Sequence, residues 1–238
     1  MQQSQSRAAP TASSGSVPPY PPPMSLLLPV PADARGRRLA QLYLGLALYG
    51  FSSALLVEAA LGLDPWDVLH QGLSRQTGAS IGTCTIVVGV VVLLLWIPLR
   101  QRPGLGTVSN AILIGLAIDA SLALLPEPPN TAWRWAFLLT GIVLNGVATG
   151  AYIGAGLGPG PRDGLMTGIA GRGHSIRLVR TALEIVVLAL GWTLGGSVGI
   201  GTVAYALGIG PLAHVFIPVF TVSNADPASP PDTHASVA

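Results

Sequence analysis

Six long apolar stretches dominate the sequence and limit what the chain can fold into. They cover residues 39–61, 81–99, 105–125, 135–153, 179–194 and 200–222. A helix needs about 20 apolar residues to cross a bilayer, and in lipid it satisfies its own backbone hydrogen bonds. Only 9% of the residues are charged, whereas soluble domains carry about 25%. The sequence therefore predicts an all-α, polytopic membrane protein with about six transmembrane helices.

The two ends of the chain have a different composition. Residues 16–23 read SVPPYPPP, and a polar, Pro-rich segment of this kind cannot bury a hydrophobic core. We expect a disordered extension over residues 1–38, with Met24 as the translation start, and a disordered tail over residues 223–238. Between them lie a first membrane repeat, residues 39–125, and a second, residues 134–222.

The two membrane units repeat one another in sequence. Matched positions 96 residues apart include Gly62 with Gly158, Pro65 with Pro161 and Asp67 with Asp163. After a one-residue gap the offset is 95, and LGTVSNAILIG at residues 105–115 matches IGTVAYALGIG at residues 200–210. Each unit holds an odd number of apolar stretches, so the second unit must be inverted in the membrane relative to the first. Inverted repeats recur in secondary transporters, whose binding sites lie near the midplane.

Each unit also contains one short, polar segment, at residues 65–78 and 161–173. Both segments open with Pro-x-Asp, and proline is favoured at the first turn of a helix. We expect two half-helices or re-entrant segments, with Asp67 and Asp163 in their first turns. There a carboxylate can simply cap the helix, because it favours the positive end of the helix dipole. The alternative is that the two segments meet from opposite sides, as gates or as an ion-binding pair.

Arginines between the apolar stretches predict the orientation, because cytoplasmic loops are enriched in basic residues. Arg35, Arg37 and Arg38 precede the first span, which places the N-terminus in the cytoplasm. With six spans, the remaining inside arginines are Arg100, Arg102, Arg162, Arg172, Arg177 and Arg180. The sequence thus predicts a multi-pass protein of the cell membrane with both termini in the cytoplasm.

The fifth apolar stretch begins with charged residues on one helical face. Arg177, Arg180 and Glu184 are spaced i, i+3 and i+7, and Arg180 and Glu184 form an i,i+4 pair. A charged group inside a span is costly and is a functional hypothesis by default. Either the pair locks this helix to its neighbours, or the group lines a pathway whose two arginines receive an anion at the cytoplasmic mouth.

Three further polar residues fall inside the apolar stretches. Glu58 matches Gly154, which belongs to a row of glycines spaced every four residues, and small residues allow close helix contact. Glu58 is therefore expected to face the bundle, or else to reach the outer interface. Asp119 and His214 occupy equivalent places in the two units, which indicates a shared inward face. His214 can titrate near neutral pH, although a histidine satisfied by a neighbour is the more common case.

Residues on the short segments and near the span ends are expected at the membrane surface. His70 is predicted to be interfacial, and Trp66, Trp133 and Trp135 fit an aromatic belt.

Signatures of enzymes and cofactor sites are missing from the sequence. There is no interpretable Ser-His-Asp arrangement, no His/Cys metal spacing and no P-loop. Cys84 is the one cysteine, so neither a disulfide nor a thiol metal site is available. The net charge of +2 gives no reason to expect nucleic acid. We predict no enzymatic activity, no cofactor and no metal, with the lipid bilayer as the main partner.

Over residues 36–222 the chain resembles the bacterial YczE-type membrane proteins, relatives of the YitT group. The resemblance rests on LGLDPWDVLHQGLSRQTGASIGTCTIVVG, RDGLMTGIAGRGHSIRLVRTALEI and GTVAYALGIGPLAHVF. Positions that carry it include Pro65, Asp67, His70, Arg162, Asp163, Arg177, Arg180 and Glu184. It implies an integral protein of bacterial plasma membranes and assigns no activity.

Taken together, these features predict a transporter of a small solute or ion. The alternative is a scaffold or regulator that transports nothing and holds a cytoplasmic partner; neither reading fixes whether the chain forms a homo-oligomer. Polar pairing between the two units would favour the transporter, whereas a path sealed by apolar side chains would favour the scaffold.

Overall fold

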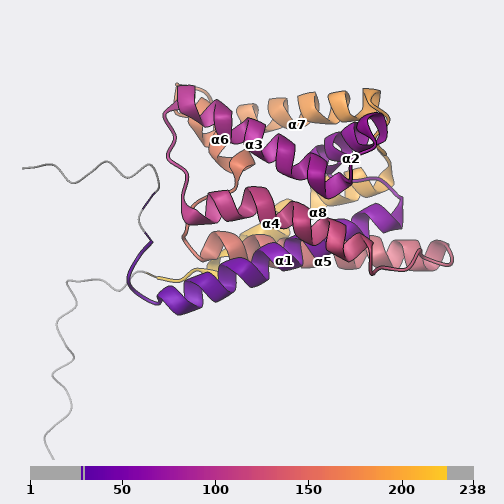
Figure 1. Ribbon diagram of the computed structural model, residues 1–238, viewed down its shortest axis with the longest axis horizontal. Helices are drawn as coiled ribbons and strands as arrows, with labels where there is room; N and C mark the ends of the chain where they lie inside the picture. Colours follow the sequence, from indigo (N-terminus) through magenta and orange to yellow (C-terminus); the bar gives the residue numbers. More distant parts are fainter. Residues whose placement is uncertain (1–27, 29, 224–238) are drawn as a thin grey trace, which may run out of the picture.

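The computed structural model describes residue 28 and residues 30–223, and within this part the chain forms eight α-helices and no strand (Figure 1). The helices are α1 (Arg35–Ala59), α2 (Pro65–Thr77), α3 (Ile81–Leu99), α4 (Leu105–Leu122), α5 (Thr131–Gly154), α6 (Pro161–Ala170), α7 (Ile176–Thr193) and α8 (Ile200–Phe220). The all-α class is confirmed. The first helix begins at Arg35 rather than at residue 39. Met24, most of the extension and residues 224–238 lie outside the described part.

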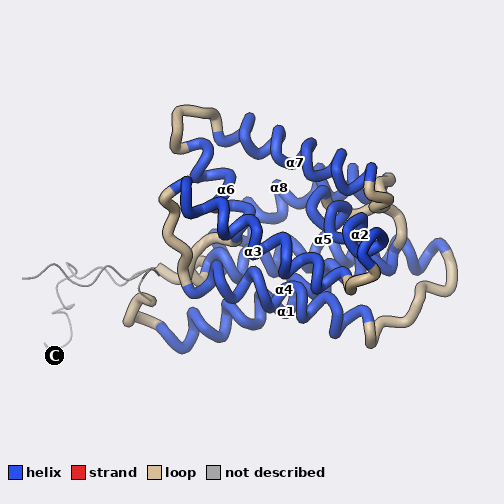
Figure 2. Tube along the Cα trace, turned by 45° about the horizontal axis from the view of Figure 1, so that its top comes forward, coloured by secondary structure: helices blue, strands red, loops and turns tan. Residues whose placement is uncertain are grey.

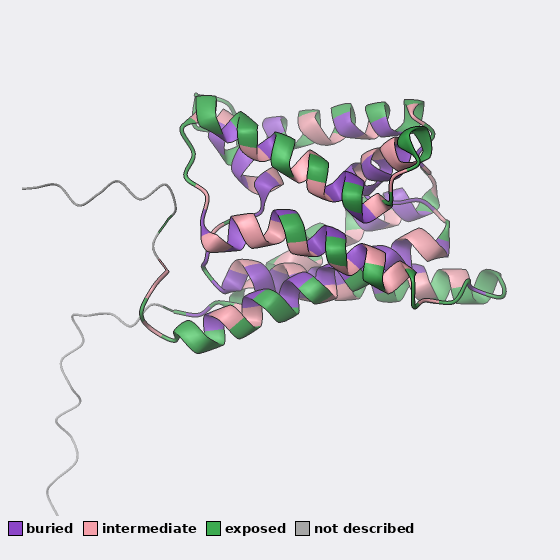
Figure 3. Cartoon of the chain, viewed as in Figure 1, coloured by how far each residue is buried: buried purple, intermediate pink, exposed green. Residues whose placement is uncertain are grey.

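Five helices, α1, α3, α4, α5 and α8, are long and apolar enough to cross a membrane. Their outer faces carry apolar side chains such as Leu44, Ile97 and Leu207, which are largely exposed. Exposed positions recur along the helices in Figure 3. Such a surface suits lipid, because acyl chains compete for no hydrogen bond. The sixth expected span, α7, forms at the predicted place but carries Arg177, Arg180 and Glu184 within its 18 residues.

The helices form two groups joined by short loops (Figure 2). In the first group, α1 packs against α4 and α5, and α5 packs against α8. In the second group, α2 and α6 each contact both α3 and α7. Contacts between α3 and α4 join the two groups, and the short helices α2 and α6 lie at opposite ends of the molecule in Figure 1.

The row of glycines on α5 allows α8 to approach closely, as the sequence predicted. A Cβ atom at Gly146 would lie 2.6 Å from the Cβ of Leu212, and one at Gly150 would lie 2.7 Å from the Cβ of Phe216. Real side chains do not approach this closely, so only glycine fits at these positions.

The turns before α2 and α6 have the same structure. Each contains a glycine in the left-handed region, with φ of 112° at Gly62 and 117° at its counterpart. The backbone N–H of Gly201, at the start of α8, donates to the carbonyl of Leu61 over 2.7 Å. Correspondingly, the N–H of Gly106, at the start of α4, donates to the carbonyl of Leu157 over 2.8 Å. Each half thus supplies the helix start that holds the turn of the other half, which explains why the Gly-Thr-Val motif occurs twice.

Candidate functional site

A polar cavity of about 370 Å³ lies between the two helix groups. It is many times larger than the roughly 30 Å³ that one water molecule occupies in the liquid, so it has room for a small solute. The polar side chains that line it are Tyr49, Asp64, Asn110, Thr149, Tyr152, Arg162, Asp163, Arg180, Glu184 and Tyr205. Residues from both sequence repeats contribute to this lining.

The two short helices begin at this cavity. Asp64 is the N-cap of α2, and its Oδ1 accepts hydrogen bonds from the backbone N–H groups of Trp66 (3.0 Å) and Asp67 (3.2 Å). At the equivalent place before α6, the N-cap is Gly160, which has no side chain to offer. Asp67 and Asp163 lie in the first turns, as the Pro-x-Asp pattern predicted. In α2, however, the capping carboxylate is Asp64 and not Asp67.

Trp96 of α3 holds the start of α6 in place. Its indole N–H donates to the carbonyl of Pro161 over 3.0 Å. The same ring covers Gly164, where an added Cβ would overlap the indole. The position of α6, and of the residues in its first turn, therefore depends on this contact.

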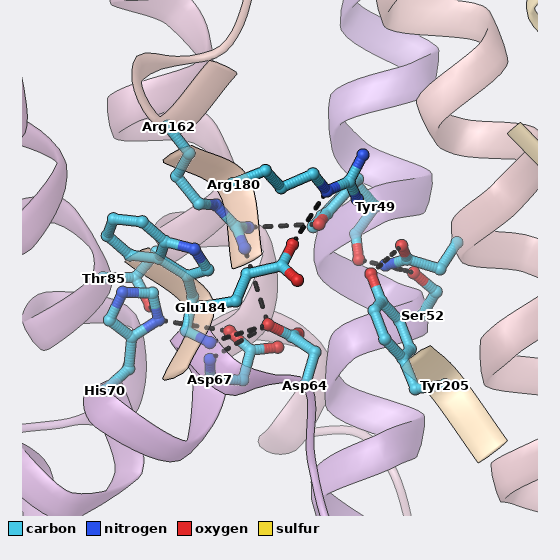
Figure 4. A network of polar contacts seen from close by, with 12 residues as sticks. Tyr49, Ser52, Asp64, Asp67, His70, Thr85, Arg162, Arg180, Glu184 and Tyr205 are labelled. Atoms are coloured by element: carbon cyan, nitrogen blue, oxygen red, sulfur yellow. Dashed lines mark hydrogen bonds and ion pairs between the residues drawn. The ribbon is translucent and has the colours of Figure 1, made fainter. Parts of the chain in front are cut away.

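Arg162 joins the two halves at the centre of the cavity (Figure 4). Its Nη2 donates to the hydroxyl of Tyr49 over 3.1 Å, and its Nη1 lies 3.5 Å from Oδ1 of Asp64. The guanidinium carbon also lies 5.5 Å from the ring centre of Trp66 and 5.8 Å from that of Tyr49, within cation–π range. One basic side chain from the second half is thus held by an acid and two aromatic rings from the first.

His70 extends this network away from the cavity. Its Nδ1 lies 3.1 Å from Oδ1 of Asp67 and 3.2 Å from the hydroxyl oxygen of Thr85 on α3. The prediction that His70 is interfacial was wrong, because its side chain is only 3% exposed. Trp66 is also buried and does not belong to a surface belt, whereas Trp133 and Trp135 are exposed as that belt requires. The reason is that α2 packs between α3 and α7 instead of lying on the surface.

Polar side chains hold Tyr205 and Tyr152, which belong to the cavity wall. The hydroxyl of Tyr205 donates to Oδ1 of Asn145 over 2.8 Å, and Nδ2 of Asn145 donates to the hydroxyl of Ser52 over 3.0 Å. On the other side, the hydroxyl of Tyr152 donates to Oδ2 of Asp163 over 3.1 Å. None of these neutral residues was identified from the sequence. A fully buried asparagine within an apolar stretch was the one available signal, because a buried amide needs partners.

The predicted pair on α7 reaches the cavity. The Nε of Arg180 lies 2.9 Å from Oε1 of Glu184, with side chains that are 56% and 35% exposed. Both residues line the cavity, but Arg177 does not and is exposed. The expected face of three charged residues therefore contributes two of them to the site.

Glu58 and Asp119 lie outside the cavity lining. Glu58 is half-buried near the end of α1. Asp119 holds the start of α3, since its Oδ1 accepts from the backbone N–H of Gly82 over 2.8 Å and its Oδ2 accepts from the hydroxyl of Ser80 over 2.5 Å. Asp119 therefore caps the start of α3, and this role accounts for a carboxylate at this position without a transport pathway.

The expected inward face shared by Asp119 and His214 was wrong. His214 is exposed on α8. This helix packs against α5 through Leu212 and Phe216, and a residue two positions from each points to the other side, because successive residues turn by about 100°.

At the end of the bundle where the chain enters α1, Arg38 is buried although the sequence places it in a basic loop. Its Nη1 donates to the carbonyl of Ala155 over 2.9 Å, and its Nη2 lies 2.8 Å from Oδ2 of Asp33. The hydrogen bond from Arg38 holds the pKa of Asp33 below its ordinary value. Arg38 therefore anchors the first helix to the end of α5.

No group of three His, Cys, Asp or Glu side chains within residues 30–223 is arranged to hold a metal ion. Cys84 is buried in α3.

Apolar spanning helices around a polar cavity define an integral, polytopic membrane protein. Residues 36–218 match the family described as "Family of unknown function (DUF6198)", and the chain belongs to this family. The resemblance to YczE-type proteins is confirmed by the relatives below.

Three bacterial relatives cover most of the chain. An uncharacterized protein of Haemophilus influenzae is 42% identical over 185 residues, or 77% of this chain and 85% of the relative. The uncharacterized membrane protein YczE of Bacillus subtilis is 33% identical over 179 residues, or 74% and 83% of the two chains. The uncharacterized protein YyaS of the same organism is 28% identical over 184 residues, or 74% and 90%. No solved structure matches the chain.

Proposed function

We propose that this protein moves a small polar or ionic solute across the cell membrane through the cavity between its two helix groups. The observation that carries this proposal is the pairing of Arg162, from the second half, with Asp64 and Tyr49, from the first. Charged groups inside a membrane protein are costly and mark pathways for ions and polar substrates. In a scaffold that only held a partner, apolar contacts at the same place would avoid the cost of burying charged groups.

An inverted repeat, which we infer for the two units, would give this cavity its mechanism. α1 packs against α4 as α5 packs against α8, and α2 contacts α7 as α6 contacts α3. In Figure 1, α1 and α4 run in one direction and their counterparts α5 and α8 run in the opposite direction. Transporters built in this way open the same central site alternately to the two sides. The orientation with both termini in the cytoplasm belongs to this proposal.

Cysteine accessibility tests the proposal. The background is Cys84→Ala, into which Ala213→Cys introduces a thiol at the cavity wall and Ala182→Cys introduces one on the exposed face of α7. A membrane-impermeant thiol reagent should modify Ala213→Cys from both sides of the membrane, because the cavity opens to each side in turn. The lipid-facing control should not react. A cavity thiol that reacts from neither side would contradict transport.

Solute profiling then addresses the substrate. Cells that lack the protein are complemented with the wild type or with Arg162→Gln, and the solutes of cells and medium are compared. A solute whose distribution responds to the wild type but not to the variant identifies the substrate class. Profiles that are the same in all strains would count against the proposal.

A further inference from the structure

We propose that Asp64 and Asp67 together form a proton-binding site, whose occupancy decides whether Arg162 remains attached to α2. The role of this site in coupling proton binding to solute movement rests on the proposed transport function. The protonation itself is a property of the folded protein and can be measured without transport.

Both carboxylates are buried and incompletely bonded. Asp64 is 1% exposed and Asp67 is 2% exposed. Oδ1 of Asp64 accepts two backbone hydrogen bonds and faces Arg162, and Oδ1 of Asp67 faces His70. The second oxygen of each acid, Oδ2, is buried without a hydrogen-bond partner. A buried carboxylate oxygen without a donor is costly, so a donor is missing from each acid.

The carboxyl groups of the two acids lie side by side at the start of α2 (Figure 4), where Asp64 also accepts from the backbone N–H of Asp67. One proton on either acid supplies the missing donor, since an O–H on one oxygen can donate to the carboxylate of the other. Two like charges at such a separation do not both stay ionised easily, and a shared proton is the usual solution.

The charge balance of the cluster requires the same proton. Asp64 and Asp67 bring two negative charges, and Arg162 brings one positive charge at 3.5 Å from Asp64. With His70 neutral, the buried cluster carries a net charge of −1, and one bound proton makes it neutral. Neutrality matters here because uncompensated charge in a low-dielectric interior is strongly destabilising.

Among the described residues, Arg162 is the one arginine that pairs with either acid, and the other partner, His70 beside Asp67, is taken as neutral. The other titratable or charged groups that face this region or line the same cavity come from α1, α2, α5, α6, α7 and α8, and they are Tyr49, His70, Tyr152, Asp163, Arg180, Glu184 and Tyr205. Arg180 is already paired with Glu184 at 2.9 Å. A metal ion is a poorer fit than a proton, because no set of three acidic, His or Cys ligands is present among the described residues and such ions take several ligands.

Proton binding has a direct structural consequence. When a proton from water bonds to the cluster, the charge on Asp64 that attracts Arg162 is shared or removed. The guanidinium then retains only Tyr49 and the two aromatic rings. The bridge between α2 and α6 therefore weakens when the proton binds and strengthens when it leaves. Proton binding is in this way linked to opening of the cavity on one side, and the solute would move in the same direction as the proton or in the opposite one.

Infrared difference spectroscopy of the purified protein in lipid tests the site. A protonated carboxyl group has a C=O stretching band that an ionised one lacks. We expect this band in the wild type at low pH and its loss as the pH is raised, because the proton then leaves the carboxyl pair. The band should be missing from Asp64→Asn. Asparagine is as good an N-cap as aspartate, so α2 should still form. Asp67→Asn provides the second variant, and Glu127→Gln, on an exposed loop, is the control that should keep the band.

Each outcome decides one point. A wild type without the band, or a band that persists in both Asp64→Asn and Asp67→Asn, would overturn the proton site. A band that sodium chloride removes at constant pH, while choline chloride does not, would overturn it in favour of a sodium site. A normal band in a protein that moves no solute would overturn the transport function and leave the proton site standing.

Discussion

Replacing Arg162 with glutamine is the change that tests the centre of the site most directly. Glutamine is uncharged and two bonds shorter, so the change removes the hydrogen bond to the hydroxyl of Tyr49, the positive charge that faces Asp64 and the two ring contacts. Each cation–π contact is worth about 0.5–2 kcal/mol. Leaving one partner of a fully buried ion pair alone costs about 3–5 kcal/mol.

The cost for Arg162→Gln should be smaller than the sum of these terms. The pair is long, at 3.5 Å, and the Arg162 side chain is 26% exposed, so water compensates part of the loss. We expect the free energy of unfolding to fall by roughly 2–4 kcal/mol. Unfolding of the detergent-solubilised protein by sodium dodecyl sulfate, followed by circular dichroism, measures this quantity.

A double-mutant cycle separates the pair from other effects. If Arg162 and Asp64 interact as the structure shows, Asp64→Asn combined with Arg162→Gln should cost less than the two single changes added together, by about 1–2 kcal/mol. Arg102→Gln, on an exposed loop, is the control and should change stability by less than about 0.5 kcal/mol. Strict additivity, or a variant Arg162→Gln as stable as the control, would refute the reasoning.

Three further predictions concern packing, chemistry and topology. Gly164→Ala should lower the free energy of unfolding by about 1–3 kcal/mol, because the added methyl group overlaps the indole of Trp96. Gly210→Ala is the control and should not destabilise, since no atom lies within 4 Å of its Cβ position. Equal melting temperatures for the two variants would contradict this packing. Glu184→Gln should change the free energy of unfolding by less than about 1 kcal/mol, since its ion pair is largely exposed, yet it should abolish solute movement. If the melting temperature and the transport activity fall together, the pair is a structural lock instead. Reporter fusions at Asn130 and Gly171 should report the outside and the inside of the cell respectively, and the reverse pattern would refute the orientation.

Local signals in the sequence predicted much of the fold. The apolar stretches gave the long helices, and the Pro-x-Asp pattern gave the first turns of α2 and α6, because proline position and apolar length act within a single segment. The glycine row predicted close packing for the same reason. The ion pair on α7 also follows from spacing within one helix.

The site was harder to predict because its residues come from segments that are far apart in the sequence. Asp64 and Arg162 are 98 positions apart, and Tyr205 and Asn145 are 60 apart. Nothing in the local composition of α2 distinguishes a polar helix at the membrane surface from one packed inside a bundle, so His70 and Trp66 were placed at the surface. His214 was misplaced for a related reason. Equivalence in a sequence repeat fixes the position along a helix, but the neighbouring helices decide which side faces inward.

The reciprocal turns have a consequence for how the protein is made. The carbonyl of Leu61, before α2, is satisfied by the N–H of Gly201, at the start of the last helix. The ribosome adds Gly201 only after the sequences of seven of the eight described helices have been synthesised. Until α8 is inserted, this carbonyl lacks its partner in an environment where an unsatisfied backbone group is costly. The turn of the first half therefore lacks this hydrogen bond until α8 is inserted. In a chain truncated before α8 the bond would never form, and we expect the membrane's quality-control proteases to degrade such a chain.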